Sequence, residues 1–562
     1  MDGRSTRIAA AAALAVLLAS VWGAAGALGA EAKPAAPAAA PKPAAPAAKP
    51  AGPPAKEQAA PLRPVEPAAP QAPPLPTALE KARKIAAINR ELFKRFQEQN
   101  YDECKKLLDQ VLAIAPDNAV AFYNLACVYA RTGKADEAVQ ALTTSIEKGY
   151  AGLRHMERDP DLDSIRGLEG YKAILARKDA IQRERADKVS RALKARFGEG
   201  YLYDVDHENK LIFATNVDER MLQDLRRHVT AYGEAQRRDL FTHGFEQYVT
   251  VVVPKAEGPS PVGGYYSHGD HLLVARTVGM TLVHEFTHAL HAADQEGIGQ
   301  QHPIWVTEGL ATLFESSSVE GGHAVPGPNR RANTIQDIVR RKKHVPWAKF
   351  FKYSHAEFMR GALVAYPEAR YIMMYFYEQG LLKTWYDAYV ETFEEDASGA
   401  KAVEKAFAKP LARVEADWVA WVKSLERLPT RIAANHAYLG VAVVPVTDGL
   451  RISSVVAGSG AEKAGLKAGD VVIQVGDQRV IEPEQLMGIV SGEEVGAEVR
   501  VHFRRDGKYE ETVVVLGAKP ALPKPPPAEP KPAEPPKAPK PAEPAKPAED
   551  PKPAQAPARK AA

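Results

Sequence analysis

The chain has 562 residues, which is enough for several domains. Its 73 Lys and Arg nearly balance its 70 Asp and Glu, and the densest basic run between the two ends, residues 340–343, is short enough to be a solvated helix end. Because a nucleic-acid-binding protein normally carries a concentrated basic surface, this composition argues against a nucleic-acid partner.

The N-terminus has the three parts of a secretory signal. Arg4 and Arg7 precede an Ala-, Leu- and Val-rich run over residues 8–21, and small residues at 25–27 offer a cleavage site. This predicts a signal peptide over residues 1–27 and a bacterial protein that is exported, to the periplasm or beyond. The run is short for a membrane span, which needs about 20 strongly apolar residues. We therefore expect no stable span after cleavage; an uncleaved anchor is the alternative.

Pro, Ala and Lys dominate two segments, residues 28–76 and 519–562. Such segments cannot bury enough apolar surface to offset the entropy lost on ordering. They are predicted to be a disordered linker and a disordered tail. The blocks between them have the hydrophobic patterning of folded domains.

A repeat of 34 residues characterises the first block, residues 77–179. Its apolar positions Cys104, Leu108 and Val111 recur 34 positions later as Ala138, Leu142 and Ser145. With the large and small positions of the second copy, the block resembles a pair of tetratricopeptide repeats, an all-α fold. The resemblance implies either a protein-binding surface or a structural spacer. Cys104 and Cys127 lie on apolar faces and are predicted to be packed, reduced thiols.

The second block, residues 181–428, opens with strand-like runs at 211–215, 248–253 and 271–274. A helical segment follows that contains His284, Glu285 and His288 in the pattern His-Glu-x-x-His. The two His side chains are one turn apart on one face, so that both can reach one metal ion. Glu285 would then stand beside the open coordination position as a proton acceptor.

A second helical segment supplies the third expected ligand, Glu308, 20 residues after His288 in the run Trp-Val-Thr-Glu-Gly-Leu-Ala. Glu315, Asp294 and Glu296 are its rivals. Two His and one carboxylate leave a position open for water, as catalytic zinc sites do. The block resembles the gluzincin metallopeptidases, in particular the peptidase-MA-like group. That resemblance implies an α+β zincin-type domain, one Zn²⁺ per chain and Glu285 as general base.

Tyr366 precedes Pro367, and Pro367 is predicted to occupy the first turn of a helix, which puts Tyr366 just before the helix start. The resemblance to gluzincin aminopeptidases implies that such a Tyr donates to the oxyanion of the tetrahedral intermediate. Tyr371 is the competing candidate, and both could instead be core aromatics.

The third block, residues 434–518, resembles the PDZ domains of bacterial periplasmic proteases, a mainly-β fold. The residues that carry the resemblance are the run Tyr438, Leu439, Gly440 and Val441, a Gly-rich segment at 464–472, and a strand over 497–504 followed by an Asp-Gly turn. It implies that Tyr438–Val441 bind a terminal carboxylate and that a strand edge accepts an extended C-terminal peptide. The alternative is a PDZ fold that only packs against the protease domain.

Together these features predict a multidomain, exported zinc metallopeptidase that hydrolyses peptide bonds with a zinc-activated water. The Gly-x-Met-Glu-Asn segment of the aminopeptidases is missing, which favours cleavage within a chain. The repeats and the PDZ domain would recruit protein or peptide substrates and partners. One alternative is a non-catalytic envelope scaffold that uses the same two domains for protein binding. Another is a zinc hydrolase that acts on a non-peptide bond, against which the peptide-binding PDZ domain argues.

Overall fold

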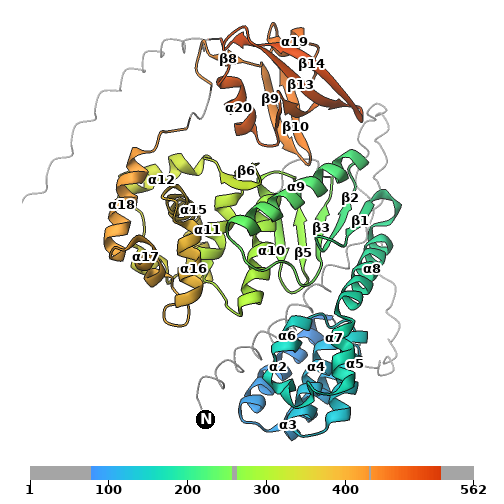
Figure 1. Ribbon diagram of the computed structural model, residues 1–562. Helices are drawn as coiled ribbons and strands as arrows, with labels where there is room; N and C mark the ends of the chain where they lie inside the picture. The colour runs from blue at the N-terminus through green and yellow to red at the C-terminus, as the bar shows by residue number, and fades with distance from the viewer. Residues whose placement is uncertain (1–77, 256–262, 429–431, 521–562) are drawn as a thin grey trace, which may run out of the picture.

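The computed structural model describes residues 78–255, 263–428 and 432–520 (Figure 1). The predicted signal peptide, the 28–76 linker and almost all of the predicted tail lie outside these ranges. The described chain forms a helical N-terminal part, a mixed central part and a β-rich C-terminal part. None of the helices within it is both long and apolar enough to span a bilayer.

The N-terminal part is a stack of antiparallel helices. Its elements are α2 (Ala78–Gln97), α3 (Tyr101–Ile114), α4 (Ala119–Arg131), α5 (Ala135–Glu147), α6 (Leu153–Arg158), the 3₁₀ helix η2 (Pro160–Ile165) and α7 (Glu169–Ala176). The second helices of the two pairs, α3 and α5, begin at Tyr101 and Ala135, which reproduces the 34-residue period.

The side chains of the repeat pattern are the ones that hold the helix pairs together. The six repeat positions are all buried: Cys104, Leu108, Val111, Ala138, Leu142 and Ser145. The prediction of packed, reduced thiols is confirmed, because Cys104 and Cys127 are both buried and free.

The long helix α8 (Lys178–Phe197) connects the N-terminal part to the central part, and the predicted division at 179–181 falls in its first turn. A short 3₁₀ helix, η3 (Gly198–Gly200), follows it. Ala186 of α8 is buried together with Ile212 and Tyr248 of the central part. A second link is made by Arg158, whose guanidinium donates to the carbonyl of Gly297 at 2.6 Å.

A five-stranded sheet organises the central part. Its strands are β1 (Leu202–Asp206), β2 (Leu211–Thr215), β3 (Val249–Val253), β4 (Gly264–Ser267) and β5 (Leu272–Ala275), in the order β1-β2-β3-β5-β4. The pairs β2–β3 and β3–β5 are parallel, and the pairs β1–β2 and β4–β5 are antiparallel. Helices α9 (Glu219–Asp239) and α10 (Met280–Ile298) share a buried core with the sheet. β4 forms one edge of this sheet, and α10 packs against both β4 and β5.

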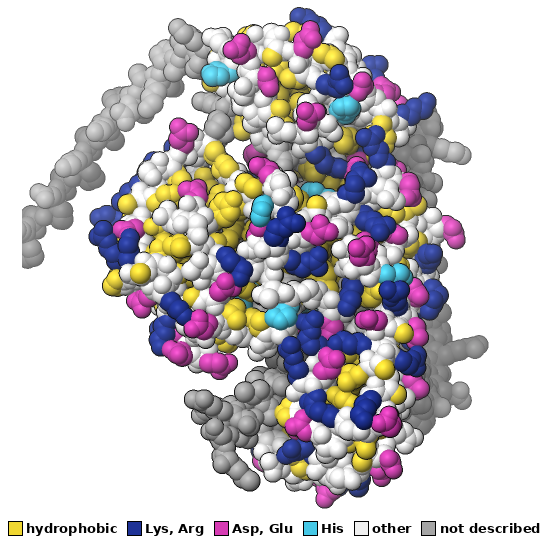
Figure 2. Space-filling model, viewed as in Figure 1, with side chains coloured by type: hydrophobic (Ala, Val, Ile, Leu, Met, Phe, Trp, Pro, Cys, Tyr) yellow, Lys and Arg dark blue, Asp and Glu magenta, His cyan; other side chains and the backbone are white. Residues whose placement is uncertain are grey.

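A helical lobe completes the central part beside the sheet (Figure 1). Its elements are α11 (Ile304–Phe314), the hairpin β6 (Ser317–Glu320) and β7 (His323–Pro326), α12 (Arg331–Arg340), α13 (Trp347–Phe350), α14 (His355–Arg360), α15 (Ala362–Glu378), α16 (Leu382–Thr392), α17 (Ala400–Phe407) and α18 (Leu411–Ser424). The basic run 340–343 at the end of α12 is exposed, as predicted. Figure 2 shows acidic and basic side chains interspersed over the visible face.

The C-terminal part is a small sheet with one substantial helix. It contains β8 (Ala437–Tyr438), β9 (Val441–Val446), β10 (Gly449–Val455), α19 (Gly460–Lys463), β11 (Val471–Val475), β12 (Gln478–Arg479), α20 (Pro483–Ser491), β13 (Glu498–Arg505), β14 (Lys508–Val515) and β15 (Gly517–Ala518). The main strand order is β14-β13-β11-β10-β9, which leaves β9 at one edge. Asp506 and Gly507, both with positive φ, turn β13 into β14 as the sequence predicts.

Candidate metal centre

Helix α10 carries both predicted His ligands and has a well-defined end. Leu282, Val283, Phe286 and Leu290 form its buried face, which holds the helix in the core of the central part. It ends at Gly299, whose φ of 76° is the left-handed conformation that glycine adopts without steric cost. His284 and His288 lie on the opposite, partly exposed side.

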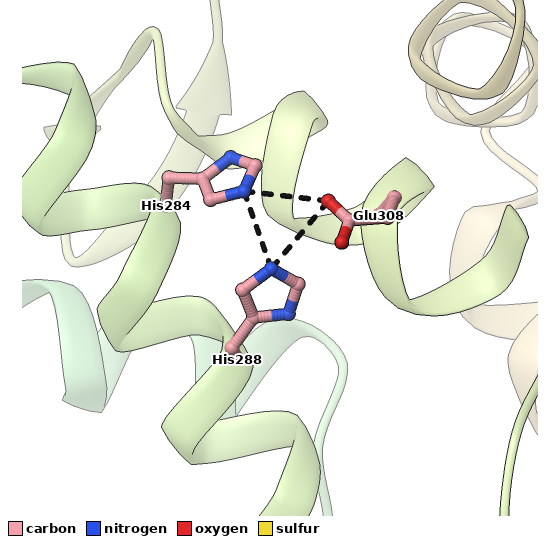
Figure 3. A group of neighbouring side chains, drawn as sticks. All are labelled: His284, His288 and Glu308. Atoms are coloured by element: carbon pink, nitrogen blue, oxygen red, sulfur yellow. Dashed lines mark hydrogen bonds and ion pairs between the residues drawn. The ribbon is translucent and has the colours of Figure 1, made fainter. Parts of the chain in front are cut away.

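Three ligand atoms converge between α10 and α11 (Figure 3). The Nε2 atoms of His284 and His288 are 3.2 Å apart. The Oε2 atom of Glu308, from the second turn of α11, is 3.4 Å from the first of these nitrogens and 3.6 Å from the second. The side chains are 16%, 19% and 13% exposed, so the group is recessed and still open to solvent.

The size of this triangle fits a tetrahedral zinc ion. Zinc bonds of about 2.0–2.2 Å to nitrogen and oxygen place two ligands of a tetrahedron about 3.3–3.5 Å apart. The three observed separations average close to that value. The Oε2 atom of Glu308 is also buried, and among the described residues it has no donor with hydrogen-bond geometry. A cation would satisfy this oxygen together with the two nitrogens.

The carboxylate of Glu308 is kept charged by its neighbours. Burial pulls its pKa upward, but the imidazole rings of His284 and His288 outweigh burial and hold the pKa well below its usual range. A charged carboxylate is the form that binds a divalent cation.

A second carboxylate orients the first histidine. Glu315 is the C-cap of α11, about two helical turns after Glu308. Its Oε2 is 3.2 Å from Nδ1 of His284. Asn329 donates to Glu315 at 2.9 Å, and Arg331 forms an ion pair with it. Since a carboxylate accepts hydrogen bonds, this contact assigns the proton of His284 to Nδ1 and leaves the Nε2 lone pair directed at the triangle.

Glu308, rather than its rivals, therefore completes the group of three. Asp294 is buried elsewhere, where it accepts from the backbone N–H groups of Thr242 and His243 and from the hydroxyl of Tyr386. Glu296 pairs with His268 at 3.3 Å. Glu315 reaches the outer nitrogen of His284 and not the triangle.

The helix that carries Tyr366 starts earlier than the sequence predicts. Pro367 is not in the first turn: α15 begins at Ala362, so Tyr366 and Pro367 lie inside it. The carbonyl that Pro367 leaves without a helical donor belongs to Leu363, which is 88% exposed and can be solvated. The ring of Tyr366 lies 6.0 Å from the guanidinium carbon of Arg331, and its hydroxyl donates to the sulfur of Met359 at 3.8 Å. Burial raises the pKa of its hydroxyl, and the charges of Glu308 and Glu285 raise it further, against the opposing effect of Arg331.

Tyr371 occupies a different environment. It is 2% exposed, and its ring packs near Trp421 in the core of the helical lobe. The adjacent Arg370 is fully buried and donates to the carbonyl of Leu313 at the end of α11. Of the two tyrosines, only Tyr366 has a pKa that responds to Glu285 and Glu308.

The predicted carboxylate-binding run of the C-terminal part leads into the edge strand. Tyr438 ends β8, Leu439 is buried, and Val441 begins β9. Gly440 has a φ of 93°, and a Cβ there would lie 2.1 Å from that of Ser459, so this turn requires glycine.

Comparisons with known proteins identify the two outer parts. Residues 95–150 match the model of the tetratricopeptide repeat, and residues 437–516 match the model of the PDZ domain. The predictions of a repeat block and a PDZ domain are therefore confirmed, and with them the multidomain layout. Both are protein-interaction modules.

The relatives match the chain only in part. Among them are a chloroplast protein of Arabidopsis thaliana, 28% identical over 14% of this chain, and a probable periplasmic serine endoprotease, DegP-like, of Marinomonas sp., 31% identical over 18%. The chain spans about a quarter of the length of each. An aminopeptidase N family structure from Idiomarina loihiensis covers 58% of this chain and 68% of its own at 11% identity, with a TM-score of 0.25.

Replacing Glu315 by Gln should weaken zinc binding about tenfold, because a neutral amide is a poorer acceptor for the His284 Nδ1–H. The measurement is a zinc titration of the full chain in competition with a chromophoric chelator. Glu320→Gln, an exposed carboxylate on β6, is the matched control. Equal zinc affinity of the Glu315→Gln and control proteins would contradict the assigned role.

Proposed function

We propose that the chain is an exported zinc metallopeptidase of the gluzincin type that cuts peptide bonds within protein chains. The observation that carries the proposal is the triangle of His284, His288 and Glu308 at zinc-ligand spacing, with Glu285 next to the first ligand. In this proposal, residues 181–428 form the catalytic domain, and one zinc ion binds per chain.

The three triangle residues would hold Zn²⁺, which supplies a Lewis acid for the scissile carbonyl and the attacking water. Glu285 follows His284 on α10 and is only partly buried, so its carboxylate can reach a water molecule at the open side of the site. It accepts the proton that this water loses on attack. The same carboxyl then delivers the proton to the leaving amine.

Tyr366 is suited to stabilise the negative charge that develops on the carbonyl oxygen. A tyrosine hydroxyl is protonated at neutral pH, and burial raises the pKa of Tyr366 further, so that it remains a hydrogen-bond donor. A donor directed at the developing oxyanion lowers the barrier because it binds the transition state better than the substrate. Tyr371, buried in the helical lobe, cannot serve in this way without rearrangement.

An extended substrate can be held by the edge of the central sheet. Among the described strands β4 pairs with β5 alone, and it packs against α10, the helix of the two histidines. Gly264 makes this close packing possible, since a Cβ there would lie 2.8 Å from a methyl group of Thr281. A peptide added to the open side of β4 would place a backbone carbonyl beside the triangle without binding either terminus.

The flanking domains are proposed to recruit the substrate. In the PDZ domain, the edge strand β9 and the run Tyr438–Val441 that leads into it are the proposed site for a C-terminal peptide. The tetratricopeptide repeats offer a second protein-binding surface. Tethering a substrate to either domain raises its local concentration at the catalytic site. Export to the periplasm or beyond is proposed from the N-terminal signal sequence.

Replacing Glu285 by Gln should abolish proteolysis while leaving the metal in place. We expect one zinc per chain in both proteins, and a loss of cleavage of about 10²- to 10⁴-fold in the variant, because the proton acceptor is gone and the ligands are not. Metal content and cleavage of denatured casein and of a peptide library are measured on the full chain. Glu296→Gln, on the same helix, is the control and should cleave like the unaltered protein.

Two results would contradict the proposal. A chain without stoichiometric metal would remove the catalytic centre. Stoichiometric zinc with no cleavage by the unaltered protein, of casein or of any library peptide, would favour the scaffold hypothesis.

Replacing Tyr366 by Phe should lower kcat about 10²- to 10³-fold, with little change in KM or zinc content, since the hydroxyl acts mainly in the transition state. Tyr371→Phe should have nearly normal kcat. Steady-state kinetics on one library-derived peptide decide between them. A larger loss of kcat for Tyr371→Phe would make the assignment of Tyr366 wrong.

A further inference from the structure

The first turn of α10 lacks a capping side chain of its own. The first four N–H groups of a helix have no partner within the helix and need acceptors from elsewhere. The N-cap residue of α10 is Gly279, which has no side chain. Met280 lies one turn before His284 on the same face of the helix. The conformation of this first turn therefore affects the direction of the His284 side chain.

The PDZ domain supplies the missing contact. The carboxylate of Glu482 lies against Gly279, beside the backbone N–H groups that open α10. A Cβ on Gly279 would stand 2.8 Å from a methyl carbon of Ile481 and 3.0 Å from Oε1 of Glu482, so any larger residue would push these two side chains away from α10. Ile481 is 4% exposed and belongs to the same buried cluster as Leu282 and Val283 of α10.

Glu482 serves two helices at once. It is the N-cap of α20, where it forms a capping box with Gln485, and it also faces the start of α10. Both helix N-termini carry partial positive charge that a carboxylate stabilises. Burial and Glu484 raise the pKa of Glu482, and Met280 and Arg330 oppose this rise.

Other contacts fix the PDZ domain in the position that this cap requires. The backbone N–H of Val278 donates to the carbonyl of Thr447 at 2.9 Å. Arg479 pairs with Asp224 at 3.1 Å. The hydroxyl of Tyr509 donates at 2.9 Å to Asp218, the residue that caps α9. The PDZ domain, which lies beside the central part in Figure 1, therefore contacts the N-terminal ends of both α9 and α10.

We propose that the PDZ domain is a structural part of the metal centre, with Glu482 as a positioning residue that fixes the first turn of α10 and thereby the direction of His284. This inference rests on the proposed zinc site. If Glu482 no longer caps α10, the first turn of the helix should fray. The two imidazole nitrogens are then no longer held at ligand spacing before the metal binds. The binding energy of the metal must then also order this turn.

The test uses the full chain and two readouts that do not depend on catalysis. One is zinc affinity by chelator competition, and the other is hydrogen exchange of the amides of residues 280–283 in the metal-free protein. Glu482→Ala should weaken zinc binding about tenfold and speed exchange in that turn. Glu482→Gln should restore most of both, because an amide oxygen at this place can still accept from the first N–H groups of α10. The matched control is Glu484→Ala, an exposed carboxylate on α20 that should leave both unchanged.

Gly279→Ala disturbs the contact between Glu482 and α10 by a substitution in the central part, and it leaves every PDZ residue unchanged. It should reproduce both effects, which covers the case in which Glu482→Ala disturbs α20 itself. Normal zinc affinity and normal exchange at residues 280–283 in both Glu482→Ala and Gly279→Ala would overturn the proposal. If the unaltered chain bound no zinc, the proposed function would fail, while exchange in the metal-free protein would still decide whether Glu482 caps α10.

Discussion

The structure depends on the convergence of three electron-donating atoms in the space between α10 and α11. Two imidazole nitrogens and a carboxylate oxygen that face one another at 3.2–3.6 Å repel unless a proton or a cation lies between them. Holding them there takes rigid support: the buried face of α10, the packing of α11 on α15, and the Glu315–Asn329–Arg331 group behind His284. The concentration of this support in one place is the strongest physical argument that a cation binds there.

The need for rigid support around the triangle also accounts for the close contacts between the domains. The central part is joined to the repeats through α8 and Arg158, and to the PDZ domain through contacts at the first turns of α9 and α10. Ile481, a PDZ residue, is buried in the core of the central part. A recruitment domain attached by a flexible linker would need none of these contacts. Under the proposed function, recruitment and catalysis would therefore share one rigid frame.

Local spacing explains what could be predicted from the sequence. His284 and His288 are one helical turn apart, so a helix alone brings them together, and the 34-residue period of the repeats and the Asp506–Gly507 turn are equally local signals. Predicting Glu308 as the third ligand required only one further helix beside the first. By contrast, the predicted helix start at Pro367 was wrong, because α15 begins at Ala362. Proline is common in the first turn of a helix, but here it lies inside one, where the carbonyl that it leaves unpaired belongs to the exposed residue Leu363. Arg331, Arg370 and Glu482 act across long sequence separations, where no local pattern marks them; Glu315, seven residues after Glu308, was visible only as a rival ligand.

The most direct test of the central claim is X-ray absorption at the zinc edge of the full chain loaded with one equivalent of zinc. The account predicts only nitrogen and oxygen neighbours at about 2.0–2.2 Å, with the outer-shell signal of two imidazole rings. A sulfur neighbour at about 2.3 Å would contradict it. That result would place the ion instead at Cys127, Asp159 and Asp161, the other group of potential ligands in the described part of the chain.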